Sequence, residues 1–208
     1  PLCLVIGCHS PHVYWEEAAG YDPNSAELPP TFVDTPETRA WRARYYTDVT
    51  KMDQQLGEVY NSVFRRTSGN TLFIYISDNG AQWPFAKWSL YDAGIRLPMV
   101  AVWPGVVRAG SRSRAMVSFA DILPTLIELA GGKAPGGLDG RSFAGVLRGN
   151  RTSHRTHVFA THSGDGTMNV YPIRAVRDAR FKYILNLHPE FKYTTHIDSG
   201  IDLDGKAY

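Results

Sequence analysis

The segment Ile74-Tyr75-Ile76-Ser77-Asp78-Asn79-Gly80 decides the fold of this 208-residue chain. Residues 72–76 are apolar, and most are β-branched or aromatic, which is typical of a strand buried on both faces of a parallel sheet. The strand then ends in three polar residues and a glycine, which permits a sharp turn. Ligands of open α/β sheets bind at the carboxyl ends of strands, where Asp78 and Asn79 stand. These two residues offer the oxygen ligands that Ca²⁺ or Mg²⁺ prefers, although a turn that merely closes a strand would use the same residues.

The composition is that of an ordinary globular protein, with 43% hydrophobic and 20% charged residues. The formal net charge of +2 is too small to indicate a nucleic-acid partner, although a local basic patch could attract an anionic sugar. No apolar run is long enough to span a membrane, so we expect no membrane partner. We expect Cys3 and Cys8 to be buried free thiols, because their odd separation on one strand points them to opposite faces.

Strands and helices alternate along the first 150 residues, and strands alone are expected after them. The expected elements are strands over 2–7, 72–76 and 99–103, helices over 36–66, 122–130 and 143–147, and, beyond a linker at 149–154, strands over 157–161, 173–177 and 181–185. Residues 1–150 are therefore predicted to form an α/β domain with part of a mixed, mainly parallel sheet flanked by helices. Residues 151–208 are predicted to form a small antiparallel subdomain.

Several sequence blocks, in this order and spacing, resemble the sulfatase family within the alkaline phosphatase-like superfamily. They are Tyr45-Tyr46-Thr47-Asp48-Val49, the strand-end segment 74–80, the region from Lys87 through 90–100 to 102–105, and Asp121-Ile122-Leu123-Pro124-Thr125-Leu126. The resemblance covers most of the chain, from about residue 1 to about residue 186. It leans toward sulfatases that act on sulfated glycans, including the heparan N-sulfatase type, on account of residues 171–178 and 181–186.

The resemblance implies a set of site residues. Asp78 and Asn79 would ligate Ca²⁺ together with acidic residues of an N-terminal segment. Lys87 would place a positive charge on the sulfate, at a position that is Lys in most members and Arg in the heparan N-sulfatases. His12 follows Pro11 where the family carries a Pro-His pair, and it would contact the sulfate oxygens or assist the leaving group. The implied partner is a sulfated carbohydrate, and the implied location is periplasmic, secreted or lysosomal.

The chain departs from the family at the nucleophile. Sulfatases carry it near the N-terminus in a Cys- or Ser-x-Pro-x-Arg motif, where the residue is converted to formylglycine, and this chain has no such motif. The family's N-terminal paired aspartates and Lys-x-His segment are also absent. We therefore expect the C-terminal portion of a sulfatase, inactive on its own. Such a portion would expose an apolar sheet edge that favours self-association or pairing with the missing N-terminal part.

A phosphomonoesterase, phosphodiesterase or phosphonate hydrolase of the same superfamily is one alternative. Those enzymes also use strand-end Asp and His residues with metal ions, but they usually have more His ligands. Asn79 stands where such a His would be, which favours a single Ca²⁺-type site.

A non-catalytic module that binds sulfated glycans is the second alternative. Trp83, Trp88 and Tyr171 could stack on sugars, while Arg174 and Arg177 could pair with sulfates. Loop packing and a solvated strand face explain the same residues, and we favour that interpretation.

Overall fold

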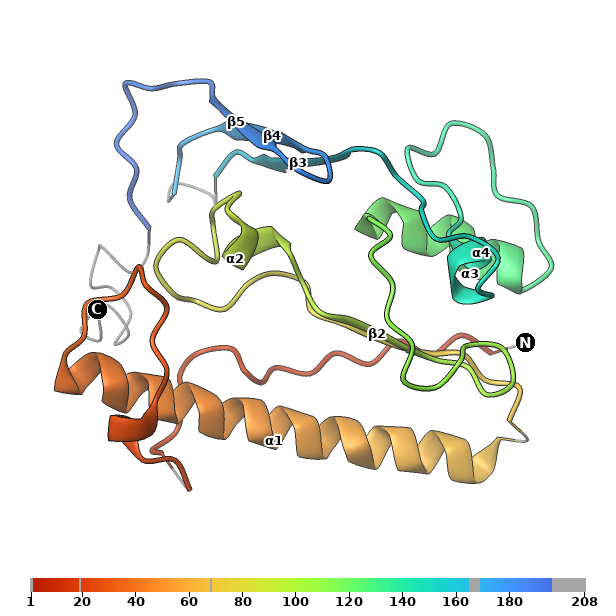
Figure 1. Cartoon of the computed structure of the whole chain (residues 1–208), viewed down its shortest axis with the longest axis horizontal. Helices are drawn as coiled ribbons and strands as arrows, with labels where there is room; N and C mark the ends of the chain where they lie inside the picture. The colour runs from red at the N-terminus through yellow and green to blue at the C-terminus, as the bar shows by residue number, and fades with distance from the viewer. Residues whose placement is uncertain (1, 19, 68, 165–168, 196–208) are drawn as a thin grey trace.

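The computed structural model describes residues 2–18, 20–67, 69–164 and 169–195, and these form an α/β fold (Figure 1). The long helix α1 (Pro36–Arg66) lies along one side, next to the ribbon of β1 (Phe73–Ile76) and β2 (Met99–Val102). A separate sheet of β3 (Val158–His162), β4 (Ile173–Arg177) and β5 (Lys182–Asn186) lies on the far side. The remaining elements are η1 (Pro23–Ser25), α2 (Asp92–Ile95), η2 (Phe119–Asp121), α3 (Ile122–Leu129) and α4 (Ala144–Leu147).

Helix α1 has the predicted bounds. Its N-cap Thr35 accepts a hydrogen bond from the backbone N–H of Thr38, and Pro36 occupies the first turn, where a missing N–H costs least. Its apolar side packs on β1, where the phenol of Tyr75 donates to Sδ of Met52 at 3.0 Å. Asp48 is buried on this helix, and burial raises the pKa of its carboxyl.

The prediction of a mainly parallel sheet is not confirmed. Strands β1 and β2 pair antiparallel, with Phe73 opposite Val102 and Ile76 opposite Met99. Strand β1 is half-buried and Ile76 is exposed, so the expected burial on both faces is wrong for this chain. An apolar, β-branched run indicates a strand, but it carries no information about the direction of the neighbouring strand.

The predicted buried strand over 2–7 is also wrong. This segment is extended but forms no strand, and Leu2, Val5 and Ile6 are exposed. A strand exists only where a neighbour pairs with its backbone, and no described residue does so here. The predicted burial of Cys3 and Cys8 is wrong for the same reason, since both thiols are exposed and free.

The C-terminal strands are antiparallel, as predicted, in the order β3-β4-β5. This sheet is fixed to α2 by Asp92, whose carboxylate pairs with Arg177 at 2.6 Å and with Lys182 at 2.5 Å. Burial alone would raise the pKa of Asp92, but the hydrogen bonds from Lys182 and Arg177 outweigh it and lower that pKa. The division of the chain at residue 150 stays a prediction, and residues 165–168 and 196–208 of the second predicted domain lie outside the described residues.

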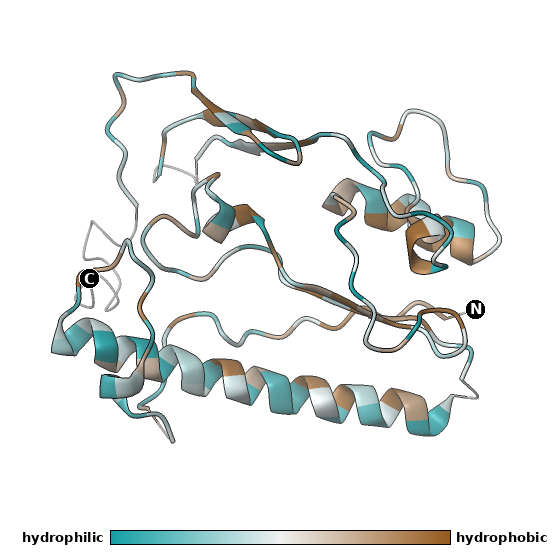
Figure 2. Ribbon diagram, viewed as in Figure 1, coloured by the Kyte–Doolittle hydropathy of each residue, from teal (hydrophilic) through white to brown (hydrophobic). Residues whose placement is uncertain are grey.

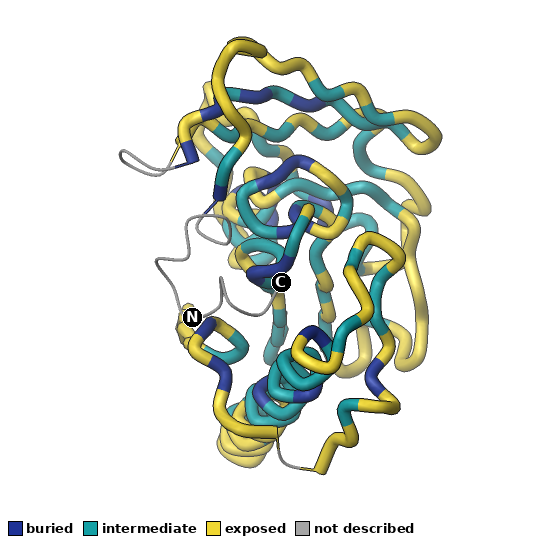
Figure 3. The backbone as a smooth tube through the Cα atoms, turned by 90° about the vertical axis from the view of Figure 1, so that its left-hand side faces the viewer, coloured by how far each residue is buried: buried dark blue, intermediate teal, exposed yellow. Residues whose placement is uncertain are grey.

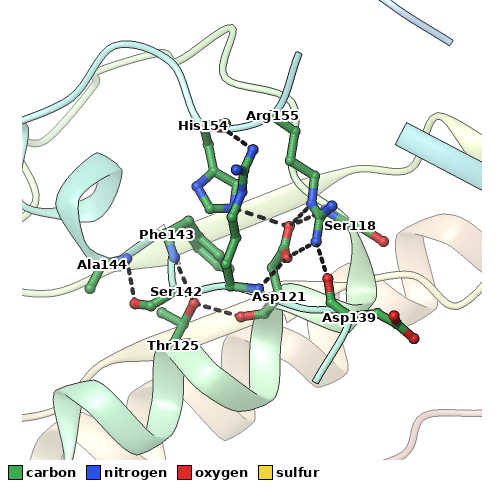
Figure 4. A network of polar contacts seen from close by, with 10 residues as sticks. Ser118, Asp121, Thr125, Asp139, Ser142, Phe143, Ala144, His154 and Arg155 are labelled. Atoms are coloured by element: carbon green, nitrogen blue, oxygen red, sulfur yellow. Dashed lines mark hydrogen bonds and ion pairs between the residues drawn. The ribbon is translucent and has the colours of Figure 1, made fainter. Parts of the chain in front are cut away.

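A buried carboxylate joins η2 to the segment that leads into β3 (Figure 4). Asp121 has no exposed side-chain surface, and Arg155 donates to both of its oxygens, with Nε at 2.7 Å from Oδ2. The backbone N–H groups of Ser118 and Arg141 each donate to it at 2.9 Å, and Ser118 and Asp121 form a capping box at the start of η2. Nε2 of His154 lies 3.2 Å from Oδ2, without the geometry of a hydrogen bond.

Apolar residues concentrate on the β1–β2 ribbon and on α3, whereas α1 mixes both kinds (Figure 2). Burial is patchy: the dark-blue stretches of the described chain are short and spread over many segments (Figure 3). One apolar cluster joins Val13, Trp15, Trp83 and Ala86, and another joins Leu90, Tyr171, Ile173 and Ala175. Within the described ranges, no helix is both long and apolar enough to cross a bilayer.

Candidate functional site

Two predicted site residues that stand 75 positions apart in sequence meet in the structure. Nε2 of His12 lies 3.1 Å from Nζ of Lys87. His12 is exposed on the segment after Pro11, and Lys87 is half-buried on the loop between β1 and α2. The ammonium of Lys87 also lies 5.2 Å from the ring centroid of Trp88, within the range of a cation–π contact.

The hydrogen bonds of His12 define its tautomer. Lys87 has three N–H donors and no acceptor, so Nε2 of His12 must accept with its lone pair. Nδ1 of His12 lies 2.7 Å from the carbonyl oxygen of Val13 and must therefore carry the proton. His12 is a neutral imidazole in this arrangement, with its lone pair directed at the lysine.

The strand-end pair Asp78-Asn79 lies directly after β1, as predicted. Oδ1 of Asp78 accepts from the backbone N–H of Asn79 at 2.9 Å, and Oγ of Ser77 donates to the carbonyl oxygen of Asn79. These bonds fix the turn locally. Asp78 is exposed, and no lysine or arginine within the described ranges forms an ion pair with it.

Two glycines allow the turn and α2 to touch through their backbones. The N–H of Gly80 donates to the carbonyl oxygen of Gly94 at 3.0 Å. A Cβ on Gly80 would stand 2.0 Å from the carbonyl oxygen of Ala93, and a Cβ on Gly94 would stand 2.3 Å from that of Ala86. Only glycine fits at both positions, so these two glycines hold the Asp78-Asn79 turn against α2.

The C-terminal sheet supports the loop that carries Lys87. The phenol of Tyr171 donates to the carbonyl oxygen of Trp88 at 2.9 Å, and Nζ of Lys182 donates to that of Leu90 at 2.8 Å. Tyr171 is only 1% exposed, so it serves packing. Residues that stand 83 and 92 positions later in the sequence than their partners therefore hold the loop that carries Lys87.

Comparisons with known proteins show which family the chain belongs to. The model of the family described as "Sulfatase" matches residues 1–132. The chain belongs to the sulfatase family. The model described as "N-sulphoglucosamine sulphohydrolase, C-terminal" matches residues 80–199 of this sulfatase-family chain.

Curated relatives fit the same family. An ulvan-active sulfatase of Formosa agariphila is 32% identical over 90% of this chain and 38% of its own length. The human N-sulphoglucosamine sulphohydrolase is 32% identical over 86% of this chain and 37% of its own length. The chain thus spans about a third of the length of these sulfatases.

Solved structures confirm the α/β fold. A protein in complex with its substrate D-glucosamine-2-N,6-O-disulfate has a TM-score of 0.64 and 22% identity, covering 71% of this chain and 32% of its own. A phosphonate monoester hydrolase of Silicibacter pomeroyi has a TM-score of 0.60 and 21% identity, covering 89% of this chain and 42% of its own. At these identities, the likeness is one of fold.

The oxygen atoms of the turn at Asp78 and Asn79 suit a hard cation. Asp78 supplies an exposed carboxylate without a basic partner in the described residues, and Asn79 adds an amide oxygen. Ca²⁺ takes about six to eight oxygen ligands, so two residues make only part of a site. The described residues contain no group of three or more His, Cys, Asp or Glu that could hold a metal ion.

The structure therefore brings His12 and Lys87 together and places Asp78 and Asn79 side by side at the end of β1. Sequence reasoning missed the supports of this site, Gly94 and Asp92. The sequence does mark both residues, because the run Tyr91-Asp92-Ala93-Gly94 at the start of α2 contains an acidic residue and a glycine close together.

Four of the five residues of the glycan-module interpretation have structural contacts. Trp83 and Tyr171 are buried, which supports the loop packing that we favoured. Arg174 donates to the carbonyl oxygen of His162 at 3.0 Å, and Arg177 pairs with Asp92. The expected solvated strand face is therefore not what Arg177 forms, because its charge is paired with Asp92.

Proposed function

We propose that the natural protein containing this chain hydrolyses a sulfate ester or sulfamate of a sulfated carbohydrate. The observation that carries the proposal is the 3.1 Å contact of His12 with Lys87, on the loop that follows Asp78 and Asn79. The names of two relatives, an ulvan-active sulfatase and an N-sulphoglucosamine sulphohydrolase, support a sulfated sugar as substrate.

Lys87 would hold the sulfate. A sulfate oxygen is a better acceptor for its ammonium than the imidazole of His12, because it carries negative charge. Charge that develops on the sulfuryl oxygens during reaction would be stabilised by the same ammonium. When Lys87 turns to the sulfate, Nε2 of His12 loses its N–H partner and becomes free to bind a proton.

His12 would then serve the leaving group. As the nucleophile forms its bond to sulfur, the bond from sulfur to the sugar oxygen or nitrogen breaks. Nε2–H of His12 would give its proton to that leaving atom, and the ring returns to the neutral tautomer seen here. The carbonyl oxygen of Val13 holds Nδ1–H throughout and keeps the ring oriented.

Two further groups complete the proposal. Asp78 and Asn79 would hold Ca²⁺, which when bound polarises the sulfuryl oxygens. The nucleophile would be a formylglycine supplied by sequence outside these 208 residues, so the chain alone would not turn over sulfate. We further propose a periplasmic, secreted or lysosomal location, and pairing of the exposed apolar segment 2–7 with the nucleophile-bearing part.

The test is a substrate and metal panel with the natural polypeptide. We expect sulfate release from sulfated oligosaccharides with Ca²⁺, and little release from phosphonate monoesters. Faster hydrolysis of a phosphonate monoester, with a preference for Zn²⁺ or Mn²⁺, would instead identify the phosphonate hydrolase alternative. Binding of the oligosaccharides without any turnover would identify a glycan-binding module.

A further inference from the structure

A groove of about 500 Å³ opens between α1 and the loop that carries Lys87. Its walls come from four separate segments and are mostly aromatic. The residues on which the argument rests are Phe32, Arg42, Tyr45, Trp83, Phe85 and Tyr91. The lining contains no carboxylate, and Arg42 is its single charged residue.

Arg42 stands among aromatic rings with most of its donors available. Its guanidinium carbon lies 4.9 Å from the ring centroid of Tyr46, 5.2 Å from that of Tyr45 and 5.5 Å from that of Trp83. Nε donates to the carbonyl oxygen of Glu27 at 3.2 Å, and in the described chain Nη1 and Nη2 have no hydrogen-bond partner. Stacking on the rings fixes the orientation of the guanidinium, so two of its N–H groups can bind an anion side by side.

The neighbouring Arg39, one turn earlier on α1, provides a contrast. It donates to both carboxylate oxygens of Asp34 and to the carbonyl oxygens of Asn24 and Ala26. Those contacts use its hydrogen-bonding capacity in tying the loop before α1 to the helix. Arg42 has no comparable structural duty in the described chain, so its free edge is available to a ligand.

The groove adjoins the candidate site. Ala86 lines it and immediately precedes Lys87. The backbone N–H of Lys87 donates at 3.0 Å to the carbonyl oxygen of Ala81, another lining residue. The segment that presents Lys87 to the sulfate is therefore also the wall of the groove.

We propose that this groove binds a second sugar of the substrate, one that carries its own anionic group, next to the sugar whose sulfate meets Lys87. This inference rests on the proposed function. Arg42 binds the sulfate or carboxylate of that sugar. Phe85 and Tyr91, which are 47% and 51% exposed and lie 5.9 Å apart, stack on its C–H faces.

Binding of a heparin-derived tetrasaccharide to the natural polypeptide tests the inference, with its desulfated, N-acetylated counterpart as a control ligand. We expect R42Q to weaken binding of the sulfated tetrasaccharide about tenfold and R42K to weaken it less. The matched control is R44Q, because Arg44 also stacks on a ring of α1, Trp41 at 4.8 Å, but does not line the groove. R44Q should bind as the wild type does.

Turnover separates this inference from the proposed function. In R42Q, kcat/KM for the tetrasaccharide should fall by a larger factor than kcat/KM for a small aryl sulfate, which is too short to reach the groove. If R42Q does not fold, tetrasaccharide binding is measured with Y91A instead. Tyr91 is exposed, and its loss should also weaken that binding. Unchanged tetrasaccharide binding in the folded variants overturns the proposal that the groove binds a second sugar, and it leaves the sulfatase proposal intact. Binding that depends on Arg42 in a protein that releases no sulfate overturns the proposed function and leaves the groove.

Discussion

Nε2 of His12 accepts a hydrogen bond from the ammonium of Lys87 at 3.1 Å, while Nδ1 of the same ring donates to the carbonyl oxygen of Val13. The contact defines a neutral imidazole of known tautomer beside a cation. It also links the segment before α1 directly to the loop after β1.

The tautomer of His12 can be read directly. We expect ¹⁵N NMR of the imidazole near neutral pH to show Nδ1 protonated and Nε2 unprotonated, because Nε2 faces a donor. In K87M the donor is gone, so the ¹⁵N chemical shift of Nε2 should change while Nδ1–H stays on the carbonyl oxygen of Val13. A wild-type spectrum with Nε2 protonated would contradict the assignment.

Loss of the Lys87 charge should impair hydrolysis more than folding. K87A should lower kcat/KM for sulfate release by about 10²–10³-fold, the usual effect of removing one preorganised donor to developing charge. K87R should retain part of the activity, since it keeps the charge. The control is K51A, which removes a lysine of α1 whose ammonium pairs with Glu16 and not with His12 or Lys87. Equal rates in K87A and K51A would exclude the assigned role.

Asp78 should carry much of the calcium affinity. D78N keeps the size of the side chain but removes its charge, so calorimetric titration should show Ca²⁺ binding weakened by at least about tenfold. D53N, which changes an exposed carboxylate of α1, should bind Ca²⁺ as the wild type does. Removal of Ca²⁺ with a chelator should stop sulfate release by the natural polypeptide. Full activity in D78N after chelation would show that the turn holds no catalytic metal.

Local signals in the sequence predicted α1, α3, α4 and the C-terminal strands well, but they did not predict the short helix α2. The bounds of α1 follow from its cap, its proline and its apolar period, all of which are encoded within the helix itself. The three C-terminal strands follow from alternation, and their partners are adjacent in sequence. The direction of β2, and whether residues 2–7 form a strand, depend on neighbouring strands, which no local pattern specifies.

The candidate site came from a different kind of information. Spacing alone could not bring His12 to Lys87, and the resemblance to sulfatases was needed to select these two residues. The resemblance did not reveal the supports, because the contacts of Gly80 with Gly94 and of Asp92 with Arg177 join segments in three dimensions. The groove around Arg42 was missed for the same reason, since its walls come from four segments.

Gly80 should tolerate no side chain. The Cβ in G80A would stand 2.0 Å from the carbonyl oxygen of Ala93, so the turn or α2 must shift. We expect the free energy of unfolding to fall by about 2–4 kcal/mol and Ca²⁺ binding to weaken with it. The control is G57A on α1, where a Cβ meets nothing within 4 Å. G57A should raise the stability by about 0.5–1 kcal/mol through helix propensity, and equal effects of the two variants would contradict the packing argument.

The stability of the chain should depend on the charge of Asp121. Burial alone would raise the pKa of this carboxyl, but the hydrogen bonds from Arg155 and from the backbone of Arg141 and Ser118 outweigh it and lower the pKa to about 2. An unfolded aspartate has an ordinary pKa of 3.8. Because the folded pKa is the lower one, the carboxylate stabilises the fold fully above pH ~4, and this contribution is lost as the pH falls toward ~2.

Denaturant unfolding at several pH values measures this dependence. The wild type should lose about 2 kcal/mol between pH ~5 and pH ~2 through Asp121. D121N should be less stable at neutral pH, because Arg155 loses its charged partner, and the difference from wild type should shrink as the pH falls. D139N is the control, since Asp139 is exposed and accepts its hydrogen bond from Arg155 through the backbone carbonyl oxygen, which the substitution keeps. A difference between D121N and wild type that is constant with pH would show that Asp121 acts through packing, because only a change of its protonation can produce the convergence.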